Sequence, residues 1–338
     1  MVLVTGVSRY LGGRFAHLLT QDPSVTRVIG VDVVPPNQDI GAAEFVRADI
    51  RNPVIAKVID QARVDTVVHM NVIATPTGAG GRVSMKEINV IGTMQLLAAC
   101  QKSPGIRRLV VKSTAGIYGS SPRDPVMFTE DNGAKVLPKS GWAKDCVEVE
   151  GYVRGFSRRR PDVEVATLRL ANFIGPGVRT ALTDYFSLPL IPTVLGFDAR
   201  LQFVHEDDGL EALRLATVTP VTGTINVAGD GILLLSQATR LVGRPSVAVP
   251  ERLSGIVGQA VRRAGLADFS AEQVRFLRFG RVMDTTRMRT VLGFEPRYTT
   301  REAFVDFVRG RRLHGPLSAD VVGRAEQNLL AVLTRLQG

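Results

Sequence analysis

Short apolar runs alternate with helical patterns along the first half of the chain, and this alternation restricts the fold more than any other feature. The runs are rich in β-branched residues and nearly continuous in hydrophobicity, as strands buried on both faces are. They lie at 2–6, 27–32, 43–49, 65–70, 107–114 and 163–170, with helical patterns near 11–20, 53–61, 84–103 and 140–157. This order predicts an α/β fold with a doubly wound parallel sheet, whose ligands bind at the carboxyl ends of the strands.

The composition excludes several other classes of protein. With 45% hydrophobic and 22% charged residues, the chain is too apolar to be disordered. No apolar run approaches the ~20 residues of a bilayer span and no signal peptide precedes the first strand, so we expect no membrane partner. Cys100 and Cys146 have neither a disulfide framework nor a metal-binding spacing. We therefore expect no metal and a cytoplasmic location.

The net charge of +10 does not indicate a nucleic-acid site. Only seven of the 42 basic residues are lysines, and the arginines are spread along the chain. Their densest runs, at 154–160 and 309–313, end predicted helices, where cations suit the helix dipole. A solvated surface is therefore expected, with no nucleic acid as partner.

The segment VTGVSRYLGG, residues 4–13, links the first strand to the first helix and has two of the three glycines of a dinucleotide fingerprint. Gly6 allows a tight turn, and Gly12 allows the helix to pack closely on the strand. The middle glycine is replaced by Arg9 or Tyr10, depending on the register. An ordinary strand-to-helix turn is the alternative. The candidate cofactor-binding residues of the loop are Gly6, Ser8, Arg9, Tyr10, Leu11 and Gly12.

Asp32 ends the second predicted strand, about 20 residues after the loop, where a carboxylate can hold the adenosine ribose hydroxyls. A carboxylate there repels a 2′-phosphate, so we expect NAD as the cofactor. Arg9 could compensate that charge, which keeps NADP as the less favoured alternative. Asp49 and Ile50 follow the third strand and suit the adenine edge, or they could belong to a capped turn before the next helix.

Seven segments follow one another in the order found in extended short-chain dehydrogenases/reductases, and the chain resembles their NAD-dependent epimerase/dehydratase family. They are TGVSRYLGG (5–13), VVHMN (67–71), INVIGTMQLLAAC (88–100), VVKSTAGIYG (110–119), LRLANFIGPG (168–177), FVHEDDGLEAL (203–213) and DTTRMRTVLGFEP (284–296). The resemblance implies hydride transfer between NAD and a hydroxylated small molecule such as a nucleotide sugar. It also implies further cofactor contacts at Met70, Asn71, Val72, Asn89, Lys144 and Leu170.

The resemblance assigns catalytic roles to Thr114, Ser140 and Lys144. Thr114 falls where the family places the hydroxyl that hydrogen-bonds the substrate oxygen, and Lys144 matches the lysine that contacts the nicotinamide ribose. Ser140 stands where the family has its proton-transferring tyrosine. Because the chain uses arginine for most basic positions, a lysine at 144 favours a function for this residue.

The replacement of the tyrosine leaves three alternatives open. Ser140 could relay a proton through water from Lys144, or Lys144 could itself be the base if burial lowers its pKa. The third alternative is a catalytically inactive NAD-binding protein with a structural, sensing or regulatory role. The enzyme is the favoured interpretation.

Two further residues are candidates for binding the substrate. Asn172 falls where relatives have an asparagine near the nucleotide pyrophosphate, although a turn residue is equally consistent. Relatives commonly carry a phosphate-binding arginine four residues before the histidine that His205 resembles. Leu201 has that position here, and Arg200 is its neighbour. Arg281 is another candidate.

The pattern loosens after residue 175, which predicts two domains. The dinucleotide-binding domain spans 1–175, and the strand–helix–strand segment 201–228 is expected to return to it. A smaller, mostly helical substrate domain comprises 176–200 and 229–316, and residues 317–338 form a docked C-terminal helix. By resemblance, the helices at 84–103 and 140–157 are candidates for a homodimer contact.

Overall fold

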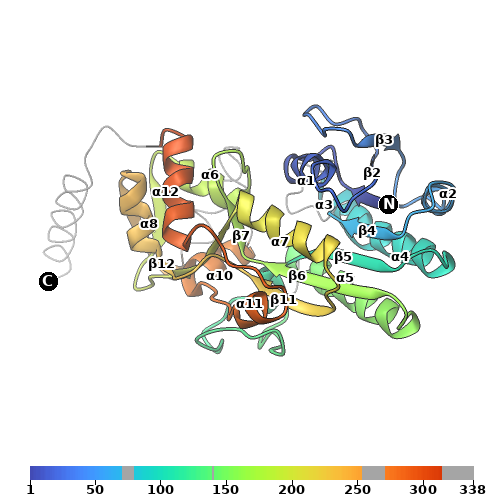
Figure 1. The fold of residues 1–338 in the computed structure, drawn as a ribbon. Coiled ribbons are helices and arrows are strands. Elements are labelled where there is room, and N and C mark those ends of the chain that lie inside the picture. Colours follow the sequence, from blue (N-terminus) through green and yellow to red (C-terminus); the bar gives the residue numbers. More distant parts are fainter. Residues whose placement is uncertain (71–79, 139–140, 253–270, 314–338) are drawn as a thin grey trace, which may run out of the picture.

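The computed structural model describes residues 1–70, 80–138, 141–252 and 271–313 (Figure 1). Seven strands form one parallel sheet in the order β11-β6-β5-β4-β1-β2-β3. These strands are β1 (Val2–Thr5), β2 (Val28–Asp32), β3 (Glu44–Arg47), β4 (Thr66–His69), β5 (Arg108–Thr114), β6 (Glu164–Leu170) and β11 (Gly223–Val227). The predicted doubly wound parallel sheet is confirmed.

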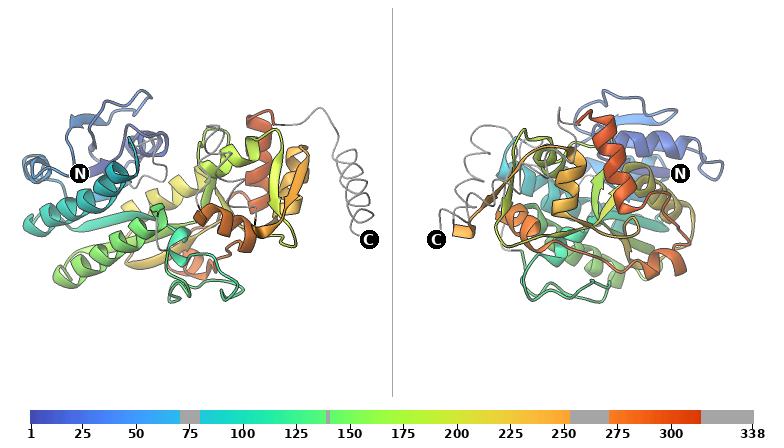
Figure 2. Two further views of the ribbon diagram at one scale, coloured as in Figure 1. Left: turned by 180° about the vertical axis from the view of Figure 1, so that it is seen from behind. Right: turned by 90° about the vertical axis from the view of Figure 1, so that its left-hand side faces the viewer.

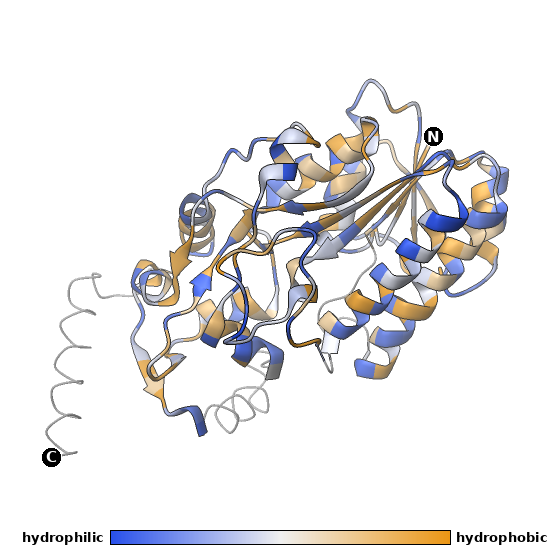
Figure 3. Cartoon of the chain, turned by 90° about the horizontal axis from the view of Figure 1, so that it is seen from below, coloured by the Kyte–Doolittle hydropathy of each residue, from blue (hydrophilic) through white to orange (hydrophobic). Residues whose placement is uncertain are grey.

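Helices cover both faces of this sheet. On one face lie α1 (Tyr10–Thr20) and α7 (Glu206–Val218), and on the other lie α2 (Val54–Gln61), α4 (Gly92–Lys102) and α5 (Gly141–Arg159). Successive strand residues alternate between the two cores: Val2 and Val4 pack on the α1 side, and Leu3 packs on the α2 side. Burial on both faces explains the nearly continuous apolar strands, and Figure 3 shows orange strands beside helices banded in orange and blue.

The chain reverses its direction of winding at β1, which lies between β2 and β4. Helices leave the carboxyl ends of neighbouring strands in opposite directions at such a point and open a crevice for a ligand. The loop that carries Gly6 and Arg9 follows β1 directly. The topology therefore brings this loop to the ends of β2, β4 and β5.

The helix expected at 84–103 is three segments in the structure. α3 (Arg82–Lys86) continues into a π-helical turn, η2 (Glu87–Ile91), before α4 begins. The predicted helix is therefore present from Arg82 to Lys102, but it is not a regular α-helix throughout. A π-turn accommodates one residue more than an α-turn and is frequent at functional sites. Asn89 lies at its centre and is fully buried.

Most of the second half builds a smaller lobe, at the end opposite to α2 and β3 (Figures 1 and 2). It contains three short two-stranded sheets, β10-β7, β12-β9 and β13-β8. Aromatic rings dominate its core, with Phe304 packed against Phe186, Phe203 and Phe307. Its elements are β7 (Asn172–Ile174), α6 (Ala181–Ser187), β8 (Ile191–Val194), β9 (Arg200–Leu201), β10 (Phe203–His205), β12 (Leu233–Leu234), α8 (Leu235–Val242), β13 (Ser246–Val249), α10 (Ala271–Phe279) and α12 (Thr300–Gly310). The helix α11 (Thr286–Thr290) packs instead beside β11, in the core of the large sheet.

The segment 201–228 returns to the large sheet only in part. Its second strand, β11, pairs with β6, and α7 packs on the sheet. Its first strand, β10, pairs instead with β7, because the chain has already left the large sheet after Leu170. The exact domain boundaries stay a prediction. The C-terminal helix predicted at 317–338 lies outside the described residues.

Candidate active site

The glycine-rich loop has glycines where the backbone requires them. Gly6 has a φ of 82°, and a Cβ on Gly12 would lie 2.1 Å from the Gly6 carbonyl oxygen. Arg9 is the N-cap of α1, with an extended backbone (φ −91°, ψ 150°) that any residue adopts. The missing middle glycine therefore causes no backbone strain, but it places a long cationic side chain at the start of α1.

Asp32 connects this loop to the end of β2. Its Oδ2 accepts a hydrogen bond from the Ser8 N–H at 3.1 Å, and its Oδ1 accepts one from the Val33 N–H at 2.8 Å. The Asp32 charge also acts on Arg9, whose pKa is lowered by burial and raised in part by this carboxylate. The carboxylate thus lies directly beside the loop, as a ribose-binding residue would.

Tyr10 and Asp49 make contacts that the sequence did not reveal. A Cβ on Gly177 would lie 1.9 Å from the Tyr10 hydroxyl, so Tyr10 packs against the segment that enters the smaller lobe. Arg14 donates to the same hydroxyl at 3.2 Å. Asp49 forms a salt bridge with Arg51 at 2.7 Å, and this partner lowers its pKa. Both candidates therefore have structural partners.

The remaining cofactor candidates are mostly buried around the same edge of the sheet. Met70 donates its N–H to the Thr5 hydroxyl at 3.1 Å, just after β4. Asn89 donates its side-chain amide to Asp145 of α5 at 3.2 Å. Ile50 and Leu170 are buried and Leu11 is partly buried. Asn71 and Val72 lie outside the described residues.

Thr114 ends β5 and is buried. Its Oγ1 accepts the Gly116 N–H at 3.0 Å and so caps a short 3-10 helix, η3 (Ala115–Tyr118). A Cβ on Gly116 would lie 3.2 Å from the Trp142 ring, which places this ring close to Thr114. Within the described residues, the buried indole N–H of Trp142 has no hydrogen-bond partner. The Thr114 hydroxyl proton and the indole N–H are thus two donors in one small region.

Lys144 lies in the first turn of α5, two residues after Trp142. Its side chain is 45% exposed, and its Nζ is 4.0 Å from Glu148 Oε1. Such an exposed pair holds a lysine only weakly. The next residue, Asp145, is fully buried and ion-paired with Arg82. Ser140 lies outside the described residues.

Arg281 lies between two small pockets on the side of the smaller lobe. Its Nε donates to the Gly119 carbonyl at 2.8 Å and its Nη2 donates to the Ser120 hydroxyl at 3.1 Å. Burial lowers the pKa of Arg281 to about 10, so it remains cationic at neutral pH. One pocket is lined by Ala115, Ala171, Asn172, Gln202, Phe276, Arg281 and Met283. The other is lined by Gly116, Gly119, Ser120, Val136, Pro138, Ala143, Glu272, Arg275 and Arg281.

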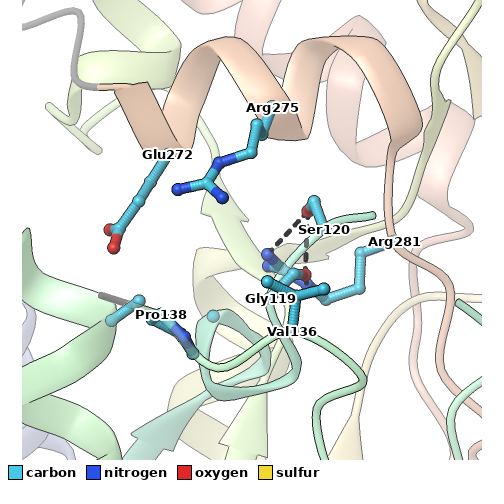
Figure 4. Close-up of a pocket in the computed structure, with 9 residues that line it drawn as sticks. Gly119, Ser120, Val136, Pro138, Glu272, Arg275 and Arg281 are labelled. Atoms are coloured by element: carbon cyan, nitrogen blue, oxygen red, sulfur yellow. Dashed lines mark hydrogen bonds between the residues drawn. The ribbon is translucent and has the colours of Figure 1, made fainter. Parts of the chain in front are cut away.

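Figure 4 shows how the second pocket is built: Glu272 and Arg275 point inward from α10, and Arg281 lies against Gly119 and Ser120. Arg200 lines neither pocket. Its carbonyl oxygen accepts the Arg281 N–H at 3.0 Å, so its backbone positions Arg281. Gln202, Glu272 and Arg275 were not predicted from the sequence. The close approach that positions Arg281, where a Cβ on Gly280 would lie 2.2 Å from the Arg200 oxygen, is visible only in the structure.

Comparison with known proteins identifies the family. The model of the NAD dependent epimerase/dehydratase family matches residues 2–228. The chain belongs to this family. An uncharacterized protein of Mycobacterium tuberculosis strain H37Rv is 51% identical over 317 residues, which cover 93% of this chain and 84% of that protein. An uncharacterized protein of Sinorhizobium fredii is 26% identical over 340 residues, with 89% and 92% covered.

Solved structures of epimerases and dehydratases share this fold. UDP-glucose 4-epimerase from Thermotoga maritima, solved with UDP-glucose, has a TM-score of 0.70 and 19% identity, with 92% of this chain and 98% of that chain covered. dTDP-glucose 4,6-dehydratase from Bacillus anthracis, in complex with NAD, has a TM-score of 0.69 and 20% identity, with 92% and 96% covered. No helix in the described part of the chain is long and apolar enough to span a membrane.

The NAD dependence of the epimerase/dehydratase family agrees with the cofactor expected from the sequence. The residues present also fit this cofactor. The loop approaches α1 too closely at Gly12 for any side chain, as the phosphate-binding loop of a dinucleotide site does. The Asp32 carboxylate lies beside that loop, within reach of a ribose hydroxyl. The preference for NAD over NADP stays a prediction that rests on Asp32.

Proposed function

We propose that this protein is an NAD-dependent oxidoreductase or isomerase that acts on a nucleotide sugar, or a similar hydroxylated substrate, by hydride transfer. The observation that supports this proposal is Arg281, an enclosed cation shared by two pockets near the η3 turn that Thr114 caps. An enclosed guanidinium suits an anionic substrate group such as a diphosphate. Arg275 adds a second cation, and Asn172 adds an amide on the opposite side of Arg281.

Thr114 would orient the reacting oxygen. Its Oγ1 already accepts the Gly116 N–H, so its own proton is available to a substrate oxygen. NAD, when bound, accepts and returns the hydride. The substrate hydroxyl must lose and regain a proton in the same process, and Thr114 is too weak an acid or base for this step.

Lys144 would handle that proton, directly or through Ser140 and water. Its ion pair with Glu148 spans 4.0 Å on an exposed side chain, so the lysine can turn without losing a strong contact. This role needs no tyrosine at position 140.

Turnover of nucleotide sugars tests the proposal. We would incubate the protein and NAD with UDP- and dTDP-hexoses and follow the products by chromatography. Arg281→Gln should raise KM at least tenfold, and Lys144→Met should lower kcat. The matched controls are Arg158→Gln and Lys86→Met, two exposed residues outside these pockets. Equal effects in the controls, or no turnover of any such substrate, would contradict the proposal.

A second candidate is an NAD-binding protein without turnover. Ser140 at the position of the family tyrosine favours it, as does the Trp142 ring beside Thr114. In that case NADH quenches Trp142 fluorescence saturably, no substrate reacts, and Ser140→Tyr restores no activity. Turnover that depends on Lys144 rules this candidate out.

A further inference from the structure

Lys112 is an unusual residue for its place in the fold. It lies in β5, which has β4 on one side and β6 on the other. Its backbone pairs with Leu168, and the preceding residue, Val111, pairs with His69. Interior strands of a parallel sheet are covered on both faces, and lysine is among the residues least often found there. A lysine in such a strand therefore calls for a specific role.

The pleat of β5 determines which way Lys112 faces. Val110 packs in the core that contains Val4 of β1 and Val7 of the glycine-rich loop, and Val111 packs in the opposite core. Because side chains alternate along a strand, Lys112 shares the face of Val110 and lies one step nearer the carboxyl edge. This step leads toward the glycine-rich loop. The side chain is surrounded by protein but keeps partial exposure, as expected of a residue lining a crevice.

The charges around Lys112 leave its ammonium group without an anion. Within the described residues, Lys112 makes no hydrogen bond or salt bridge, and the groups that act on it are the Cys146 thiol and the Arg9 guanidinium. Burial raises the pKa of Cys146 far above its usual value, so this thiol stays neutral. Burial, and then the charge of Arg9, lower the pKa of Lys112. Two cations thus converge at the loop, where Asp32 attracts Arg9 but forms no ion pair with Lys112.

We propose that Lys112 and Arg9 together bind the pyrophosphate of NAD in place of the close backbone approach that a middle glycine provides. The inference deepens the NAD site and rests on NAD as its cofactor. A glycine at position 9 would let the phosphates approach the amides at the start of α1. The Arg9 side chain would hold them farther out, where its guanidinium and the Lys112 ammonium could both reach their oxygens. Such charge-assisted contacts are strong in a crevice that excludes water.

Calorimetry with fragments of the cofactor tests this role without any catalytic readout. Lys112→Met, which has a similar length and no charge, should weaken binding of NAD and ADP-ribose about 10- to 100-fold, the range expected for a charge-assisted contact. Adenosine, which has no pyrophosphate, should bind as it does to the unaltered protein. The wild-type affinity for ADP-ribose should also fall more steeply with salt than that of Lys112→Met. Lys57→Met, an exposed change on α2, is the matched control.

Three results would overturn the proposal. Unchanged NAD affinity in Lys112→Met means that the amine does not touch the cofactor, and higher affinity means that it obstructs the site. Equal losses for adenosine and ADP-ribose mean that the variant has disturbed the whole loop. Thermal unfolding shows whether Lys112→Met is misfolded. Removal of a buried charge should leave the melting temperature unchanged or raised, so a lower melting temperature would indicate misfolding and not a local change in the loop. Failure of the proposed reaction looks different, with intact NAD binding and no turnover.

Discussion

Arg82 holds Asp145 with both ends of its guanidinium, since Nη1 and Nη2 each lie 2.7 Å from one carboxylate oxygen. Nη2 also donates to the Gly141 carbonyl at 2.9 Å. Gly141 begins α5, and Asp145 is fully buried one residue after Lys144. Arg82 therefore fixes the first turn of the helix that carries the candidate catalytic lysine.

Removal of this guanidinium should destabilise the protein. Among the described residues, Arg82→Met leaves the buried Asp145 carboxylate with the Asn89 amide as its remaining side-chain partner. Leaving a buried charge without its ion-pair partner costs about 3 kcal/mol. Urea unfolding measures the difference in the free energy of unfolding. Arg154→Met, at an exposed arginine with a longer 3.6 Å ion pair, is the control and should cost less than about 1 kcal/mol. Equal losses in the free energy of unfolding would show that the contact between Arg82 and Asp145 stabilises the protein no more than an exposed ion pair does.

The stability should fall in mild acid because of His69. Burial, and then the charge of Lys112, lower the pKa of His69 to about 4, whereas an unfolded histidine titrates near 6.5. The unfolded state therefore takes up a proton first as the pH falls. The contribution of His69 to stability is complete above pH 6.5 and is lost progressively down to about pH 4, by about 3 kcal/mol in all.

Comparison of His69→Gln with the unaltered protein separates the effect of this histidine on stability from that of the titrating carboxylates. The free energy of unfolding of His69→Gln should depend less on pH between 6.5 and 4 than that of the unaltered protein. His17→Gln, at a histidine whose side chain is 36% exposed, is the control and should change the pH dependence less than His69→Gln does. Identical slopes for His69→Gln and the unaltered protein would mean that His69 is not held neutral.

Asp32 should decide between NADH and NADPH. Asp32→Asn removes the negative charge while it keeps an acceptor for the Ser8 N–H. Binding of NADH should weaken about tenfold, in line with the loss of one charge-assisted contact, and binding of NADPH should be unchanged or stronger. Energy transfer from Trp142 to the reduced cofactor measures both affinities. Asp39→Asn is an exposed control, and a similar loss there would argue against a specific role for Asp32.

Turnover should depend more on the hydroxyl of Thr114 than on its methyl group. Thr114→Ser keeps the acceptor for the Gly116 N–H and the free proton, so turnover should stay within a few-fold of normal. Thr114→Val loses both and should lower kcat about 100-fold, a typical loss for one positioned hydrogen bond to a reacting oxygen. Steady-state kinetics with a confirmed nucleotide-sugar substrate compare the two variants. If valine and serine behave alike, the substrate oxygen does not use this hydroxyl.

The large sheet could be predicted well from the sequence because the apolar pattern that identifies a strand lies within the strand itself. Most strands of the sheet carry their own apolar run, and the glycine-rich loop at Gly6 marks the first connection from a strand to a helix. The pockets around Arg281 depend instead on close packing of Gly280 against Arg200, segments that are far apart in the chain. No local pattern reveals such an approach. The bridge from Tyr10 to Gly177 was hidden for the same reason.

Lys112 could have been identified from the sequence. The scarcity of lysine, which favoured a function for Lys144, applies equally to a lysine inside the apolar run RLVVKST. The resemblance drew attention to Thr114 in that segment, because the family gives a role to the hydroxyl and none to the residue two positions before it. What the structure adds is the direction of the Lys112 side chain, given by the pleat of β5, and the nearby Arg9 charge.

The π-turn at Glu87–Ile91 also determines how the chain can vary. A π-turn contains one residue more than the α-helix around it, so deletion of Ile88 would allow 82–102 to become one continuous α-helix. Each residue of an α-helix turns by about 100°, so residues before the deletion would rotate by that amount relative to α4. Arg82 would then leave Asp145 while the apolar face of α4 stayed in place. The extra residue thus sets the rotation of the Arg82 end of this helix relative to the α4 end. The number of residues in this segment is therefore as constrained as their identity.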